Sequence, residues 1–99
     1  MNSTLFKIKK GKLATWLEWC AYLNNEKETA VETLREENIL FEGSMHFKIH
    51  DDDYVLLYAS HTGDPLPATD REINKLHKEK KYECFELISK QKSNYFFTA

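Results

Sequence analysis

The chain has 99 residues, of which 41% are hydrophobic and 30% are charged, and its formal net charge is −2 at pH 7. This length and composition predict one folded domain over residues 1–99 and exclude a disordered or multidomain chain. The near balance of 14 basic and 16 acidic residues gives no general attraction to nucleic acid or to an anionic membrane, so we expect neither as a partner.

The sequence lacks a membrane-spanning segment, a signal peptide and a metal or redox motif, and this limits the expected compartment and cofactors. No apolar run approaches the ~20 residues that cross a bilayer, and Met1–Lys7 lacks the apolar core of a signal peptide. The two cysteines, Cys20 and Cys84, do not have the spacing of a zinc or redox motif, so we expect reduced thiols. We therefore predict a cytoplasmic protein with no metal and no cofactor.

The first half of the chain predicts a strand and a long helix. In Thr4–Lys9, apolar and lysine side chains alternate, which is typical of a half-buried strand. Residues 12–38 then carry an apolar stripe at helical spacing, interrupted at Lys27. Either the Lys27 stem lies along the edge of the core, or the helix bends near Asn24 and Asn25. The stripe consists of Leu13, Trp16, Leu17, Cys20, Leu23, Val31 and Leu34.

A β-hairpin is predicted next. Residues 39–49 alternate between apolar and polar side chains, with Gly43 at a position that suits a β-bulge. Asp51–Asp53 forms a polar turn, and Tyr54–Ser60 is a strand that is apolar on both faces. The apolar set of the first strand is Ile39, Phe41, Met45, Phe47 and Ile49; its polar set is Glu42, Ser44, His46, Lys48 and His50.

The last third predicts a loop, a helix and a short strand. Residues 61–68 contain a glycine and two prolines and form the loop. Thr69–Glu72 has the pattern of a capping box, which starts a helix that either continues to about Lys90 or breaks at Lys80 and Lys81. Asn94–Thr98 is the final strand. The order β-α-β-β-α-β predicts a ferredoxin-like α+β fold, a four-stranded antiparallel sheet with both helices on one face.

The face of this sheet away from the helices is the expected interface. We place the polar set of residues 42–50 on it, joined by one side of the third strand. That side is Val55, Leu57 and Ala59 if the hairpin turn has two residues, or Tyr54, Leu56 and Tyr58 if it has three. Because a partly apolar face needs a cover, and a second copy is the simplest one, we predict a homodimer.

A family resemblance points the same way. The segment Ile8–Lys12 before a tryptophan-rich helix, residues 34–47 (LREENILFEGSMHF) and Tyr54–Ser60 (YVLLYAS) resemble an uncharacterised bacterial family of the dimeric α+β barrel group. That group includes antibiotic-biosynthesis monooxygenases and L-rhamnose mutarotases. The resemblance implies a ferredoxin-like fold and a dimer whose sheets face each other, and it transfers no reaction.

Three residues are the candidate catalytic groups. Glu42 and His46 share one face of a strand, and Tyr58 is a possible neighbour from the next strand. A carboxylate, an imidazole and a phenol together can perform acid–base chemistry. Burial against a partner sheet would raise the pKa of Glu42. The alternative is that these groups make only hydrogen bonds at the interface.

Three further residues are candidates for ligand binding. Trp16 lies on the apolar stripe, Trp19 lies off its centre, and both could border a cleft beside the first helix. His61, at the end of the third strand, could approach His46 across the hairpin. His46 and His50 stand about 13 Å apart on a strand, which is too far for one metal ion.

Three functions therefore remain open at this stage. The first is a dimeric domain that binds a small molecule between sheet and helices or inside the dimer. The second is a cofactor-independent oxygenase or sugar isomerase, and the third is a structural or protein-interaction module. A concave pocket with converging polar groups would separate the first two from the third.

Overall fold

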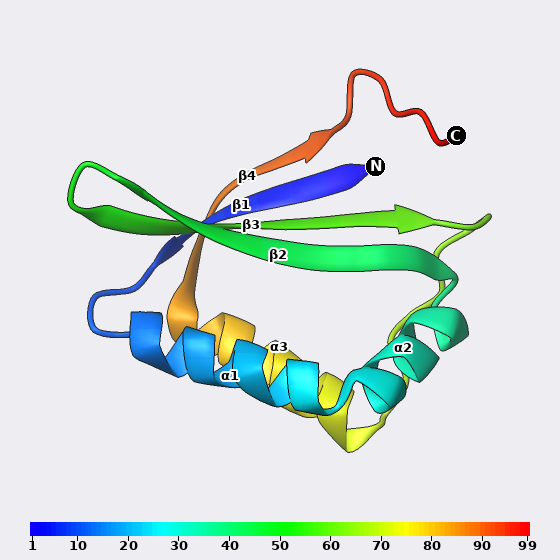
Figure 1. Ribbon diagram of the computed structural model, residues 1–99, viewed down its shortest axis with the longest axis horizontal. Helices are drawn as coiled ribbons and strands as arrows, with labels where there is room; N and C mark the ends of the chain where they lie inside the picture. Colours follow the sequence, from blue (N-terminus) through cyan, green and yellow to red (C-terminus); the bar gives the residue numbers. More distant parts are fainter.

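The computed structural model describes residues 1–99 as one antiparallel sheet with helices on a single face (Figure 1). The strands are β1 (Asn2–Ile8), β2 (Ile39–Ile49), β3 (Asp52–His61) and β4 (Phe85–Lys92), in the order β2-β3-β1-β4. The helices are α1 (Leu13–Asn25), α2 (Lys27–Glu36) and α3 (Glu72–Cys84). The α+β fold is consistent with the predicted ferredoxin-like one, with the first helix divided in two.

The division of the first helix settles the question raised by Lys27. α1 ends at Asn25 and α2 begins at Lys27, and the backbone N–H of Glu26 still bonds to the carbonyl oxygens of Tyr22 and Leu23. Asparagine side chains compete with the helical backbone for hydrogen bonds, which weakens a helix at such a pair. The bend lets Lys27 point into solvent instead of the core.

The loop between β3 and α3 is tied to the end of α2. Asn38 adopts a left-handed conformation with φ of 57° just after α2, and its carbonyl accepts a hydrogen bond of 2.8 Å from the N–H of Thr62. Arg71 then pairs with Glu32 and Glu36 at 3.0 Å each. The predicted capping box is wrong: α3 begins after Arg71, and no side chain caps it.

The end of the chain also differs from its prediction. α3 stops at Cys84, and β4 follows at once from Phe85, so neither a helix to Lys90 nor a strand at residues 94–98 forms. Phe85 is buried beside β1, and this pairing favours a strand where the sequence stripe indicated a helix. The tail after Lys92 leaves the sheet on the side away from the helices (Figure 1).

A small aromatic core joins the helices to the centre of the sheet. The ring of Phe85 lies 4.5 Å from that of Phe6 and 4.3 Å from that of Trp16, centroid to centroid. Only eight residues are buried, a small number for a chain of this size. They are Ile8, Trp16, Trp19, Thr33, Val55, Ile73, Cys84 and Phe85.

The hairpin faces the opposite way from the prediction. The pairing of Ile49 with Asp52 leaves a two-residue turn, and it sets His46 opposite Val55, which is fully buried under the helices. The polar side of β2 therefore faces the helices, and its apolar side faces away from them. We call the side away from the helices the open face. Its apolar residues are Leu5, Phe41, Met45, Phe47, Ile49, Tyr54, Leu56 and Tyr58.

A bulge in β2 lies three residues before its predicted position. The register shifts between Ile39 and Phe41, so Leu40 is the extra residue, while Gly43 pairs regularly with Tyr58. Gly43 has another role, because a Cβ atom there would overlap the phenol ring of Tyr58. The missing side chain lets that ring lie flat over β2.

We expect the substitution Gly43→Ala to lower the free energy of unfolding by about 1–3 kcal/mol, the usual cost of overpacking. The added methyl group must displace the ring of Tyr58. Urea unfolding of Gly43→Ala, Tyr58→Leu and the double variant, at one protein concentration, measures the coupling. The double variant should recover most of the loss caused by Gly43→Ala; additive losses would show that the ring does not lie there.

Candidate functional site

The three predicted catalytic residues do not converge. Glu42 and His46 lie on the helix side of β2, whereas Tyr58 lies on the open face, over Gly43. The period of two in a strand separates them, because the pairing partner of Glu42 is Ala59 and the side chain of Tyr58 points to the other face. Glu42 and Tyr58 therefore cannot act on one reacting atom within a single chain.

The two hairpin histidines are also apart. His46 contacts Asp53 at 2.8 Å through Nε2, with Lys48 3.9 Å from the same carboxylate oxygen. His61 lies at the far end of β3, opposite Ile39, and does not meet His46. His46 thus belongs to a polar cluster near the hairpin turn, and His61 lies at the end of the hairpin where Glu42 is found.

The predicted ligand-binding tryptophans are both buried. Trp16 is 2% exposed and Trp19 is 5% exposed, and both belong to the core. Trp19 stacks on Tyr22 at a centroid distance of 5.1 Å. Its indole N–H also has a specific partner, the imidazole of His77 on α3.

This contact begins a chain of polar groups from the core to the helix side of β2. Trp19 Nε1 donates a hydrogen bond of 2.8 Å to His77 Nδ1, and His77 Nε2 lies 3.7 Å from Glu42 Oε1. An indole nitrogen can only donate, so Nδ1 must be the unprotonated nitrogen of the ring. The neutral ring then carries its proton on Nε2, which points toward Glu42.

Burial shifts both titratable groups of this chain. Loss of solvent, with a smaller contribution from the positive charge of Lys81, lowers the pKa of His77 from 6.5 to about 4. Loss of solvent also raises the pKa of Glu42, which Lys81 and His61 partly offset. At neutral pH the imidazole is uncharged and acts as a hydrogen-bond donor.

Sequence reasoning named Glu42 but missed His77. A single histidine between apolar positions of a helix is a weak signal, and its partners come from elements 58 and 35 residues away. The position of Trp19 near the helical stripe gave the only hint, since a buried indole N–H requires an acceptor.

The pH dependence of stability should report on His77. The unfolded chain, with a histidine pKa of 6.5, binds a proton more readily than the folded chain, with a pKa of about 4. Stability from the neutral ring is therefore complete above pH 6.5 and is lost as the pH falls toward 4, by about 2 kcal/mol at pH 5. Glu42 acts in the opposite direction, because its raised pKa favours protonation of the folded chain.

Urea unfolding at pH 7 and pH 5 checks this expectation. Wild type should lose more stability between the two values than His77→Gln, whose side chain does not titrate. Equal losses in the two proteins would contradict the burial of a neutral imidazole.

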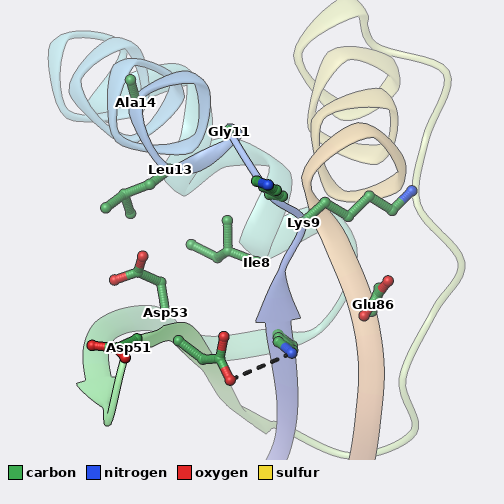
Figure 2. Close-up of a pocket in the computed structure, with 11 residues that line it drawn as sticks. Ile8, Lys9, Gly11, Leu13, Ala14, Asp51, Asp53 and Glu86 are labelled. Atoms are coloured by element: carbon green, nitrogen blue, oxygen red, sulfur yellow. Dashed lines mark ion pairs between the residues drawn. The ribbon is translucent and has the colours of Figure 1, made fainter.

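A depression near the start of α1 lacks the apolar lining of a small-molecule pocket. It has a volume of about 810 Å³, and only three of its 11 lining residues are hydrophobic (Figure 2). Lys7 of β1 lies 3.5 Å from Asp52, whereas Lys9 points away from the aspartates (Figure 2) and donates a hydrogen bond of 3.0 Å to the carbonyl oxygen of Tyr82. Lys12 binds Glu83 at 2.9 Å, so Lys7 and Lys12 are both paired with acids.

The cysteines provide no activated nucleophile. Cys20 and Cys84 are both free, and burial raises the pKa of each thiol. A reactive cysteine requires a lowered pKa. Two regions therefore remain: the apolar open face, and the Trp19–His77–Glu42 chain on the other side of the sheet.

Comparison with known proteins gives one match. The model of a family of unknown function, DUF6176, matches residues 1–96. No curated protein and no solved structure matches the chain. The resemblance to monooxygenases and mutarotases thus gains no support from these comparisons. Among the helices, none combines the length and apolar character needed to cross a bilayer.

Proposed function

The chain belongs to DUF6176, a family of unknown function, and we propose that it acts as a homodimer that holds a small aromatic or apolar molecule between two facing sheets. The observation that carries this proposal is the apolar open face. Eight large apolar or aromatic side chains lie on it, and Met45 and Ile49 are 53% and 48% exposed.

The solvent-accessible surface area of the single chain is larger than expected for a monomer, which supports the presence of a partner. Folded monomers of 11.7 kDa expose about 5,900 Å², whereas this chain exposes 7270 Å². The surplus of about 1,400 Å² exceeds the ~800 Å² that each partner contributes to a standard interface. The open face contributes apolar area to that surplus, so its burial would be favourable.

A second copy suits this face better than the chain's own tail. Phe96 of the tail reaches only one end of it, with its ring 5.7 Å from that of Phe41. Tyr95 and Phe97 remain 77% and 84% exposed. A second sheet, related by a two-fold axis and stacked about 10 Å away, would cover the rest of the face.

The ligand class follows from the chemistry of the same face. Rings of Phe47 and Tyr54 stack at 6.0 Å, and the hydroxyl groups of Tyr54 and Tyr58 are polar points in an apolar wall. Pockets for small molecules combine these features. The two free thiols support the reducing cytoplasm as the location of the protein.

Light scattering after size exclusion tests the assembly, and a thermal-shift screen of phenols and aromatic acids tests the ligand. We expect a mass of twice 11.7 kDa at micromolar concentration. A hit should lose its effect in Tyr54→Leu while the mass is unchanged. A monomer at micromolar concentration would refute the proposal, and a dimer without hits would favour a purely structural module.

A further inference from the structure

The helix side of β2 carries a second group of reactive side chains. We propose that Glu42 and His77 form a proton-transfer site for small, neutral hydroxy-carbonyl compounds. This site lies on the opposite side of the sheet from the proposed dimer interface and does not depend on it.

The geometry leaves a place for a reacting group. The 3.7 Å between His77 Nε2 and Glu42 Oε1 exceeds a hydrogen bond, so the Nε2 proton and the carboxylate oxygen each lack a direct bond to the other. Because Trp19 holds Nδ1, the imidazole cannot change its tautomer without breaking the 2.8 Å bond. A donor and an acceptor are thus fixed side by side.

Solvent reaches both groups. The side chain of Glu42 is 35% exposed and that of His77 is 22% exposed. Ser44 and His46, which share the helix side of β2 with Glu42, are also exposed, so the helices do not close over this strand. A small molecule can therefore approach Glu42 along β2.

The surrounding charges select the ligand class. Lys81 and His61 act on Glu42, and Glu36, Lys81 and His61 also act on its neighbour Glu37. The carboxylates of Glu36, Glu37 and Glu42 outnumber the ammonium group of Lys81, and Arg71 is the ion-pair partner of Glu36. A negatively charged ligand is disfavoured there, and a neutral compound with hydroxyl groups can bond to these side chains.

A carboxylate base beside a neutral imidazole donor suits removal of a proton next to a carbonyl group. Glu42 takes the proton from the carbon, and the C–H electron pair forms the C=C bond while the carbonyl π electrons move to oxygen. The Nε2–H of His77 donates a hydrogen bond to this enolate oxygen. Glu42 then returns a proton to the carbon, or a deuteron where its acid has exchanged with D₂O, so the atoms balance without a redox partner.

Exchange of carbon-bound protons in D₂O tests the proposal with hydroxyacetone, dihydroxyacetone and glycolaldehyde as probes. Proton NMR should show exchange that is at least tenfold faster with wild type than with Glu42→Gln or His77→Gln. Glu18→Gln, an exposed carboxylate change on α1, should behave as wild type. Circular dichroism verifies that each variant is folded.

A second readout addresses the imidazole directly. Nitrogen-15 NMR should show His77 neutral at pH 7 with its proton on Nε2, and Trp19→Phe should allow the other tautomer. Exchange no faster than that of Glu42→Gln with all three probes, or a proton on Nδ1 in wild type, would overturn the proposal. Neither result depends on the mass measured by light scattering.

Discussion

The substitution Met45→Lys is expected to convert the proposed dimer to a monomer, raising its dissociation constant at least 100-fold, or about 2.7 kcal/mol. Met45 lies within the apolar row of β2, opposite Leu56 on β3. Each copy would place an ammonium group in the apolar contact, where it loses solvent without a partner. Sedimentation equilibrium over a range of concentrations measures the change.

Leu17→Lys is the matched control. Leu17 is 45% exposed on α1, close to the 53% of Met45, but it lies on the helix side of the molecule. Its substitution should leave the dissociation constant unchanged. If both variants raised the dissociation constant equally, the open face would not be the specific interface.

Replacement of Trp16 by alanine should have the largest effect on stability, a loss of about 3–5 kcal/mol. The indole is 2% exposed and lies against Phe85, so its removal leaves a cavity between α1 and β4. Domains of this kind have about 5–15 kcal/mol of stability in total, so the variant is expected to be partly unfolded at 37 °C. Urea unfolding followed by circular dichroism measures the loss.

The neighbouring change Leu17→Ala provides the comparison for Trp16→Ala. Because Leu17 is half exposed, its truncation should alter the free energy of unfolding by no more than about 0.5 kcal/mol. A similar small loss for Trp16→Ala would show that the indole is not part of the core.

The fold was largely predictable because alternation and helical spacing depend on local sequence. The hairpin, the loop of residues 61–68 and the bend near Asn25 follow from such patterns. The orientation of β2 does not follow from local patterns, because a strand with one apolar side can turn that side toward its own helices or toward a partner. Here Val55 and Leu57 of β3 fill the helix side, and the apolar row of β2 lies on the open face.

The prediction for the end of the chain was wrong for a related reason. Residues after Cys84 continue a helical stripe, but Phe85 also completes the core by stacking on Phe6. Tertiary packing selects the strand, and no local signal in this segment outweighs it.

The candidate site was only partly predictable. Glu42 was named from its place on a polar strand face, yet its partner His77 comes from a distant helix. Tyr58 was grouped with Glu42 because the turn length and the face were unknown. The two-residue turn at His50 and Asp51 separates them.

The most direct test of the central claim is a mixed-isotope NMR experiment. Equal amounts of carbon-13-labelled and unlabelled chain are combined, and only contacts between copies are recorded. We predict intermolecular contacts that connect the methyl groups of Met45 and Leu56 with the ring of Tyr54. Contacts confined to α1 or α3, or none at all, would contradict an interface formed by the open face.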